Sequence, residues 1–331
     1  MVKIDLFINI KFNKKGAVMI EISICIATWN RKKDLVNIIK LLENQTMDRK
    51  QYEIIVVDSC SPDGTGEDVK NLQEEFPNVV YVENAENILA VKRNKGIEVS
   101  KSDIIVFMDD DVYPTENFVK AHYEANKDSK NTFFCGQIRF REKLVNESNY
   151  YLFRDRQHLS DKDVDVDLTF NKIVVMNLSF RKEFIRKIGG VNEKFIGYGC
   201  EDVEFGYRVK KAGFKIKYLP EAKAYHDEKS STIIEYGTKL YKTGVYGERI
   251  LKQECPEAYA ILYNRYKVIK SFLRFKTIKN ILGNFLLKTD KNRTKYSYLA
   301  YKLYLYACLA EGEKAQKSIK KMDLNDAKKG W

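Results

Sequence analysis

Short apolar runs alternate with helical segments through the first hundred residues of this sequence, and this pattern limits the fold more than any other feature. Strands are predicted at residues 22–27, 54–57, 79–82 and 104–108. Helices are predicted between them, at residues 34–45, 67–76 and 89–99. Continuous apolar strands separated by helices indicate a mostly parallel sheet with both faces covered. The chain is therefore expected to have an α/β fold whose ligands bind at the carboxyl ends of the strands.

The pattern changes towards residue 229. Residues 130–228 are less regular, with strands predicted at 133–138, 173–180, 215–219 and 222–226 and helices at 181–188 and 201–211. From about residue 230 the chain is predicted to be all helical, with helices at 233–254, 258–275 and 296–309. We expect an N-terminal extension (1–19, with Met19 an alternative start), an α/β domain (20–228) and a basic helical C-terminal region (229–331).

Charge is divided between the same segments. Residues 229–331 contain 22 Lys or Arg against 9 Asp or Glu, whereas the first 228 residues contain 36 against 37. The whole excess of positive charge, +12 for the chain, therefore belongs to the helical region. Such a segment is expected to pack on the first domain with a solvated basic face, or to meet an anionic membrane surface.

The cysteines and the apolar stretches bear on the cellular compartment. The six cysteines lie more than thirty residues apart, without a C-x-x-C pair, which excludes a zinc knuckle and a small disulfide scaffold. Lysines interrupt the apolar runs at the N-terminus, and no apolar stretch reaches the roughly 18 residues of a membrane span. A cytoplasmic globular protein is expected, which would be peripheral on the inner face of the membrane if the basic region binds lipid.

Three consecutive carboxylates, Asp109, Asp110 and Asp111, follow the apolar strand at 104–108. Adjacent carboxylates repel one another unless a cation lies among them, and oxygen ligands of this kind suit Mg²⁺ or Mn²⁺. An acidic turn before a helix that begins near Thr115 explains the same residues without a metal. Both interpretations stay open from the residues alone.

A second acidic cluster follows a glycine-rich turn, in the order Gly197, Tyr198, Gly199, Cys200, Glu201, Asp202. The glycines allow close approach of a ligand, although acids at a helix N-terminus also simply stabilise the helix. His226 ends a short strand, and a lone histidine is usually structural. Arg93 belongs to a basic helix that either binds phosphate or is solvated, and Asn30 could be an ordinary helix N-cap.

Five of these segments, in this order, resemble the family-2 glycosyltransferases, enzymes with the GT-A fold that use nucleotide-diphospho-sugars. The matching segments cover roughly residues 20–228 and are residues 23–31, 55–59, 92–97, 107–111 and 197–202. The resemblance implies a GT-A-type mixed sheet followed by an all-helical region. It also implies an inverting transfer of a hexose or N-acetylhexosamine from a UDP-sugar to a hydroxyl of a glycan, lipid-linked or protein acceptor.

The resemblance also implies roles for individual residues in binding the donor. Thr28 with the neighbouring Ala27 and Asn30, together with Asp58, should hold the nucleobase, and Arg93 should approach the base or the diphosphate. Asp110 and Gly199 are expected at the donor as well. The sequence departs from the family at Asp58, which stands alone where many relatives have two aspartates, and at Trp29, which replaces a tyrosine.

For the metal and the chemistry, the resemblance implies two further groups. Asp109 should lie near the ribose and the metal, Asp111 should ligate the metal, and His226 should complete its coordination. A nitrogen ligand beside carboxylates favours Mn²⁺ over Mg²⁺. Asp202 matches the family's catalytic base, with Glu201 beside it orienting acceptor or sugar hydroxyls.

Two other classes of function were weighed against this one. Sugar-1-phosphate nucleotidyltransferases begin with a glycine-rich phosphate loop, but residues 27–33 contain no glycine. A non-enzymatic module would use the basic region, which has 10 Lys or Arg against one acid between residues 265 and 295, to bind a membrane or nucleic acid. No nucleic-acid motif is present, so nucleic acid is not expected as a partner, whereas residues 273–287 have the composition of an interfacial helix.

Overall fold

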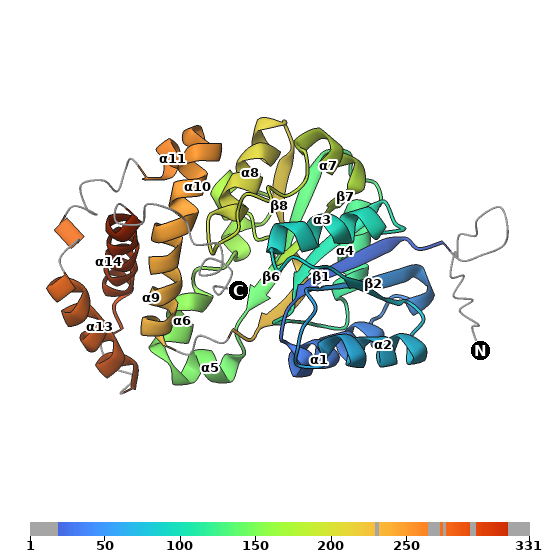
Figure 1. Cartoon of the computed structure of the whole chain (residues 1–331), viewed down its shortest axis with the longest axis horizontal. Helices are drawn as coiled ribbons and strands as arrows, with labels where there is room; N and C mark the ends of the chain where they lie inside the picture. The colour runs from blue at the N-terminus through green and yellow to red at the C-terminus, as the bar shows by residue number, and fades with distance from the viewer. Residues whose placement is uncertain (1–18, 229–231, 264–271, 274–275, 292–295, 317–331) are drawn as a thin grey trace, which may run out of the picture.

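The computed structural model describes residues 19–228, 232–263, 272–273, 276–291 and 296–316, and Figure 1 shows a central sheet with helices around it and a helical region at one end. The sheet has eight strands in the order β3-β2-β1-β4-β7-β6-β8-β5. The strands are β1 (Ile22–Thr28), β2 (Tyr52–Asp58), β3 (Val79–Glu83), β4 (Ile104–Asp109), β5 (Val112–Pro114), β6 (Thr132–Arg139), β7 (Asn177–Arg181) and β8 (Lys215–His226). Strands β3, β2, β1 and β4 are parallel, β6 is parallel to β8, and β7 and β5 run antiparallel to their neighbours. The predicted mixed, mostly parallel sheet is confirmed.

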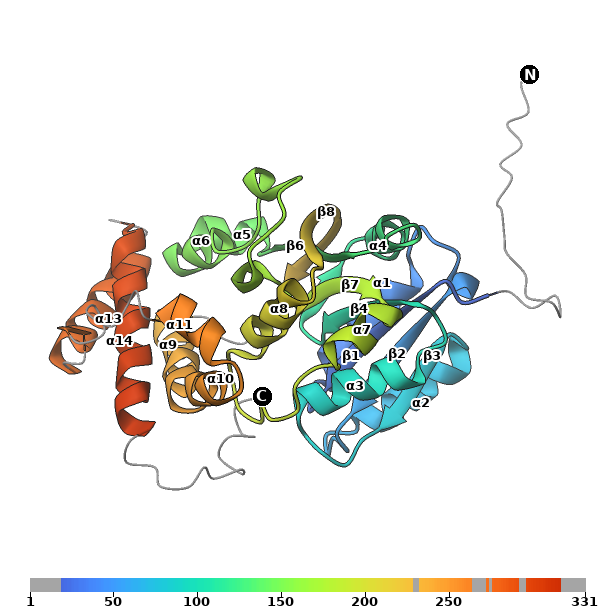
Figure 2. The same cartoon turned by 90° about the horizontal axis from the view of Figure 1, so that it is seen from above.

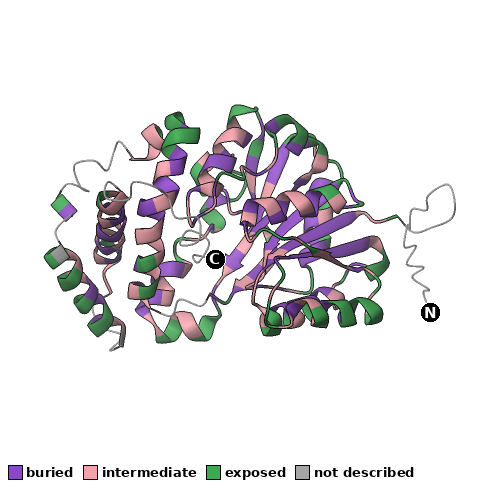
Figure 3. Ribbon diagram, in the orientation of Figure 1, coloured by how far each residue is buried: buried purple, intermediate pink, exposed green. Residues whose placement is uncertain are grey.

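Helices cover both faces of this sheet (Figure 2). They are α1 (Lys32–Glu43), α2 (Thr65–Glu75), α3 (Leu89–Val99), α4 (Phe118–Asn126), α7 (Lys182–Ile188) and α8 (Glu201–Lys211). Side chains alternate along each strand, so Ile24 packs in one core with Leu35 of α1, and Cys25 packs in the other with Ile97 of α3. Gly96 lets α3 lie directly on the sheet, because a Cβ there would stand 3.0 Å from the Cβ of Cys25. Strand residues are buried on both faces (Figure 3), as their continuous apolar sequence predicts.

Three predicted strands differ from the structure. Strand β7 begins only at Asn177, because the backbone N–H of Val174 turns away to the Sγ of Cys135 at 3.4 Å. The strands predicted at 215–219 and 222–226 are one strand, β8, which continues past Pro220 with a register shift opposite Gly136. A proline lacks the N–H of the ladder and therefore reads as a break in sequence, while an irregular pairing accommodates it. The elements β5, α5 (Glu142–Glu147) and α6 (Asn149–Asp155) have no counterpart among the predicted elements, and α4 begins at Phe118, three residues beyond the helix start considered at Thr115.

The helical region begins at a capping box, in which Thr232 and Glu235 bond each other's backbone N–H groups at the start of α9. Its helices are α9 (Ile233–Lys242), the π-helical turn η4 (Thr243–Gly247), α10 (Glu248–Glu254), α11 (Pro256–Tyr263), α13 (Lys276–Lys291) and α14 (Tyr298–Gln316). Single 3-10 turns elsewhere are η1 (Arg49–Gln51), η2 (Asp161–Asp163) and η3 (Phe170–Lys172). The helix predicted at 233–254 is therefore confirmed as α9, η4 and α10. Part of the one predicted at 258–275 lies outside the described residues.

A third core joins this region to the sheet domain. Tyr150 and Phe153 of α6 pack with Ile233 of α9, Leu286 of α13 and Tyr301 of α14. The rings of Phe153 and Tyr301 stack with centroids 4.6 Å apart. The predicted segment boundary at 228/229 lies between the end of β8 and the start of α9. Within the described ranges, no helix is both long and apolar enough to cross a membrane.

Candidate active site

A cavity of about 440 Å³ lies at the carboxyl ends of β1 and β4, beside the end of β8. It is lined by Ala27, Trp29, Asn30, Arg31, Leu89, Lys92, Asp109, Asp110, Asp111, Arg154, Met176, Tyr198, His226, Glu228 and Lys239. Six of the residues predicted from sequence are in this lining: Ala27, Asn30, Asp109, Asp110, Asp111 and His226. The sheet thus gathers at one edge residues that are up to two hundred positions apart in the chain.

The three aspartates at the end of β4 contact two arginines and a threonine. Asp109 accepts a hydrogen bond from Arg93 Nη2 of α3 at 2.8 Å. Asp110 accepts one from Thr28 Oγ1 at 2.8 Å, and Arg31 Nε lies 3.6 Å from its other oxygen. Asp111 lies 3.1 Å from Arg31 Nη2. Each carboxylate therefore has a polar partner, with Arg31 shared between Asp110 and Asp111, and these contacts relieve the repulsion expected among the three.

Asp110 and Asp111 differ in their protonation. Burial raises the pKa of Asp110 to about 7, and the charge of Asp111 adds to the rise while Arg31 opposes it. Burial acts in the same direction on Asp111, but His226 and Arg31 outweigh it and hold the pKa of Asp111 below its usual value. At neutral pH Asp111 is therefore the firmly ionised member of the pair.

Asp111 and His226 form a pair that fits a divalent cation. His226 Nε2 lies 3.5 Å from Asp111 Oδ1, because Val112 pairs with His226 across β5 and β8. The Nδ1 of His226 is buried and has no hydrogen-bond partner among the described residues. Asp109, expected as a third ligand, is instead held by Arg93, and the described part of the chain contains no group of three His, Cys, Asp or Glu able to hold a metal. The donor set fits a cation that takes its other ligands from water and phosphate oxygens.

The acids predicted for catalysis lie at the start of α8, which follows Cys200 in a left-handed conformation with φ +70°. Arg93 is buried, and its Nη1 lies 3.8 Å from Asp202 Oδ1, so one guanidinium bridges Asp109 and Asp202. The side chain of Asp202 is 39% exposed. Asp202 therefore combines a fixed electrostatic partner with access to solvent.

The neighbouring acids at this helix end titrate at different pH. Desolvation raises the pKa of Asp202 to about 6, with Arg93 lowering it and Asp109 raising it. Burial and the charge of Asp202 raise the pKa of Glu201 to about 8. The Oε2 of Glu201 is buried without a hydrogen-bond partner in the part of the chain that the structure describes. At neutral pH Asp202 is thus mainly ionised and able to accept a proton, whereas Glu201 is mainly protonated and able to donate a hydrogen bond.

Four residues predicted to bind the donor lie outside the cavity lining: Thr28 and Arg93, whose bonds to the aspartates are given above, and Asp58 and Gly199. Asp58 is buried at the end of β2, where it accepts hydrogen bonds from Ser61 Oγ at 2.5 Å and Tyr81 Oη at 3.0 Å. It borders a separate hollow of about 570 Å³. Gly199, at φ +97°, has its α-carbon packed against Thr243 of η4. Its lack of a side chain therefore serves packing against the helical region.

The cavity also contains charged residues that the sequence analysis did not assign. Glu228 accepts hydrogen bonds from Arg154 Nε at 3.2 Å, Arg154 Nη2 at 3.1 Å and Tyr150 Oη at 2.5 Å. The Nζ of Lys239, in α9, lies 3.8 Å from the same carboxylate. Burial lowers the pKa of Lys239, while Glu228 opposes the shift. No motif joins these positions, and no sequence signal placed Arg154, Glu228 or Lys239 at the site.

The cavity is lined by charges of both signs. Arg31, Lys92, Arg154 and Lys239 line it as cations, and Lys92 Nζ also binds the backbone oxygen of Thr28 at 2.9 Å. The acids Asp109, Asp110, Asp111 and Glu228 line it as well, and Arg31 and Arg154 are paired with three of them. Cations beside carboxylates of this kind suit a diphosphate that binds together with a divalent cation.

Comparison with known proteins places this geometry in a family. Residues 23–189, about half of the chain, match the family model described as glycosyl transferase family 2, and residues 156–230 match the N-terminal domain of galactosyltransferase. The chain is 23% identical over 320 residues to poly(ribitol-phosphate) β-N-acetylglucosaminyltransferase TarP of Staphylococcus aureus. The matched residues cover 87% of this chain and 95% of TarP. It spans 65%, 36% and 25% of the lengths of three other curated relatives.

Solved structures agree on the GT-A-like fold. Mannosyltransferase PcManGT of Pyrobaculum calidifontis, in complex with GDP-Man and Mn²⁺, superposes with a TM-score of 0.60 at 15% identity, over 91% of this chain and 88% of that one. TarS 1–349 of S. aureus, in complex with UDP-GlcNAc, does so with a TM-score of 0.53 at 14% identity, over 90% and 92%. The extent of the family match, with the acids at the predicted strand ends, settles the classification. The chain belongs to glycosyl transferase family 2.

Proposed function

We propose that this glycosyltransferase moves a hexose or N-acetylhexosamine from a UDP-sugar to a hydroxyl group of a glycan acceptor, with inversion and with Mn²⁺ or Mg²⁺. The observation that carries the proposal is the bridge made by Arg93, which links Asp109 at the end of β4 to Asp202 at the start of α8. A strand-end acid of the donor cavity and a solvent-accessible base are thereby fixed relative to each other. That is the arrangement a single displacement at a sugar carbon needs.

The choice of donor rests on the relatives. TarP is named as an N-acetylglucosaminyltransferase, and the solved TarS structure contains UDP-GlcNAc. PcManGT contains GDP-Man and Mn²⁺, so the test has to compare nucleotides. TarP acts on poly(ribitol-phosphate) by its name, which supports a polymeric acceptor with hydroxyl groups.

The proposed reaction uses the residues of the two acidic clusters. Asp202 accepts the proton of the acceptor hydroxyl while that oxygen attacks the anomeric carbon, and the bond from this carbon to the diphosphate oxygen breaks. Glu201, protonated at neutral pH, donates a hydrogen bond to a sugar or acceptor hydroxyl. Arg31 and Lys239 face the negative charge that develops on the leaving diphosphate. Asp111 and His226 would hold a divalent cation, which would supply further neutralisation of that charge.

Family membership decides between this function and the two alternatives. A sugar-1-phosphate nucleotidyltransferase and a non-enzymatic binding module both lose their support, since the family 2 model covers the strand ends up to Asp111 and the galactosyltransferase model covers Glu201 and Asp202. Location in the cytoplasm and a protein or lipid-linked acceptor remain predictions from the sequence.

The first test measures the melting temperature of the protein with UDP-, GDP-, dTDP- and CMP-sugars, with and without Mn²⁺. A ligand that binds the folded state raises the melting temperature by mass action. We expect a manganese-dependent rise with one UDP-sugar. If none of the nucleotide-sugars in the panel raises the melting temperature, the proposed donor site is contradicted.

The variant Asp202→Asn then separates binding from chemistry. The amide is close to the carboxylate in size but cannot take the proton, so we expect loss of transfer by a factor of about 10²–10⁴ with donor binding retained. The exposed Glu183→Gln on α7 is a matched control that keeps full activity. Loss of donor binding in folded Asp202→Asn would move Asp202 out of the role of base.

A further inference from the structure

The outer side of helix α13 carries an apolar ridge that consists of Ile278, Ile281 and Phe285. Their spacing of three and four residues places them on one face of the helix. The three side chains are 37%, 64% and 39% exposed. Lys288, one turn beyond Phe285, is exposed as well. Figure 3 shows exposed residues along this helix, at the end of the molecule away from the sheet.

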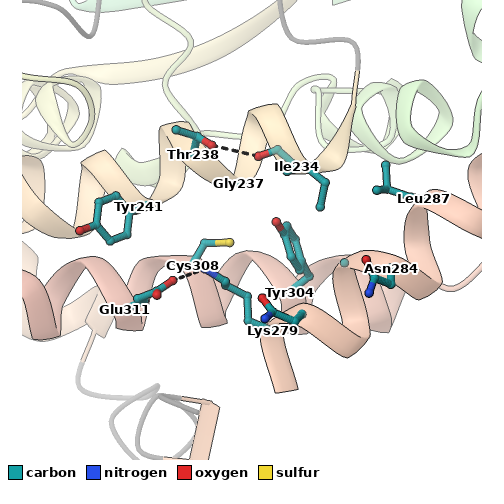
Figure 4. Close-up of a pocket in the computed structure, with 12 residues that line it drawn as sticks. Ile234, Gly237, Thr238, Tyr241, Lys279, Asn284, Leu287, Tyr304, Cys308 and Glu311 are labelled. Carbon is teal, nitrogen blue, oxygen red and sulfur yellow. Dashed lines mark hydrogen bonds and ion pairs between the residues drawn. The ribbon is translucent and has the colours of Figure 1, made fainter. Parts of the chain in front are cut away.

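The fold does not need this ridge to hold α13 in place. Leu282 and Leu286 on the inner side pack in the third core. Gly283 lets α13 pack closely on α14, because a Cβ at this position would lie 3.0 Å from the ring of Tyr304. Lys279 forms an ion pair with Glu311 of α14. Figure 4 shows Lys279, Tyr304 and Glu311 around a cavity of about 690 Å³ between α9, α13 and α14. The inner contacts thus leave the ridge exposed.

Exposed apolar side chains are concentrated in this part of the chain. Of the twelve large hydrophobic residues exposed among the described residues, eight lie between positions 261 and 299. The same stretch of sequence is strongly basic, with 10 Lys or Arg against one acid between residues 265 and 295. An exposed apolar cluster marks an interaction surface. The sequence of α13 itself contains four lysines against one acid, Asp290, so the charge of this helix favours a partner that is both apolar and anionic.

We propose that the ridge of Ile278, Ile281 and Phe285 docks this protein on a bilayer surface that contains anionic lipid. Apolar side chains of an interfacial helix enter the boundary between headgroups and acyl chains, and neighbouring lysines and arginines bind the anionic headgroups. A nucleic acid would use the charge but not the ridge. A second copy of this basic region would face like-charge repulsion. The lipid surface is the partner that uses both features.

Flotation of the full-length protein with vesicles tests the docking. The vesicles consist of phosphatidylcholine alone or with 30% phosphatidylglycerol, at 50 mM and 500 mM salt. We expect binding to the anionic vesicles at low salt and a loss of at least tenfold at high salt, because the Debye length shortens from over 10 Å to a few ångström. The double variant Ile281→Asn and Phe285→Asn should lose at least tenfold in binding to the anionic vesicles.

A matched double variant controls for the loss of exposed apolar area. Val164→Asn and Val166→Asn removes two exposed apolar side chains outside the helical region and should leave vesicle binding unchanged. Equal binding to neutral vesicles, no binding to anionic vesicles, or equal losses in both double variants would overturn the proposal. So would a dimer that only the ridge variant dissociates, without any vesicle binding. UDP-dependent stabilisation is measured in the same samples, so failure of the docking is distinguishable from failure of the donor site.

Discussion

Replacing Arg93 by methionine should change the pH at which the enzyme loses activity. Arg93 Nη1 lies 3.8 Å from the Asp202 carboxylate and favours its ionised form. Two unit charges at this distance interact with about 1 kcal/mol in water and about 4 kcal/mol at an effective dielectric constant of 20. Because the Asp202 side chain is 39% exposed, solvent screening places the value near the lower limit, at about 1–2 kcal/mol. That energy corresponds to about one pKa unit.

The assay is the pH dependence of kcat/KM, whose acid limb reports the base of the free enzyme. With a pKa of about 6 for Asp202, the wild type should lose activity as the pH falls through 6. In Arg93→Met the midpoint of this limb should move up to about pH 7. Arg93→Lys keeps the charge and should keep the midpoint within a few tenths of a unit. Arg186→Met, on the exposed face of α7, is the control for loss of an arginine elsewhere.

Two results would refute this reasoning. If folded Arg93→Met keeps the wild-type midpoint, the group that titrates is not the carboxylate beside Arg93. If the midpoint moves down, the arginine acts mainly by burying Asp202 rather than by its charge. Circular dichroism and the melting temperature establish that the variant is folded before the pH profile is measured.

Three further outcomes are expected. Asp111→Ala should abolish the manganese dependence of donor binding, measured by calorimetry, and an unchanged metal dependence would remove Asp111 as a ligand. Lys239→Met should weaken the binding of UDP about tenfold but not that of uridine, since we propose that this charge faces the diphosphate; Lys242→Met on the same helix serves as control. His122 is buried between Ser179 and Asn177, and burial lowers its pKa to about 4. As the pH falls, this histidine is therefore protonated in the unfolded chain before it is protonated in the folded chain. The free energy of unfolding should therefore fall by about 3 kcal/mol from pH 6.5 to pH 4, and an equal fall in His122→Gln would contradict this.

The sheet and one edge of the site follow from local patterns in the sequence. The apolar run that ends at Asp109 is buried on both faces, so its end had to lie at the rim of the sheet. The helix at Glu201 begins where the glycine turn predicts. These predictions were confirmed because a strand or helix end is specified by residues within a few positions of it.

The rest of the site depends on packing between distant segments. Lys239 reaches the cavity because α9 packs on α6, and Arg154 of α6 holds Glu228. Nothing near residue 239 in sequence contains that information. The bonds of Asp58 to Ser61 and Tyr81 likewise require the turn after β2 and the pairing of β2 with β3. A motif match indicated Asp58 as a ligand for the donor, but it carried no information on these competing partners.

The glycine contacts beneath α8 bear on how such enzymes can be recombined. The α-carbon of Gly247 lies against the backbone of Gly199, and those of Gly244 and Gly312 lie against each other at the crossing of η4 and α14. A side chain at any of these positions would separate the backbones and shift the turn that precedes Glu201 and Asp202. The C-terminal helices therefore cannot be replaced independently of the sheet domain. A chimera that takes this region from another member of the family has to bring a matching set of glycines with it, or the turn before Glu201 and Asp202 will shift.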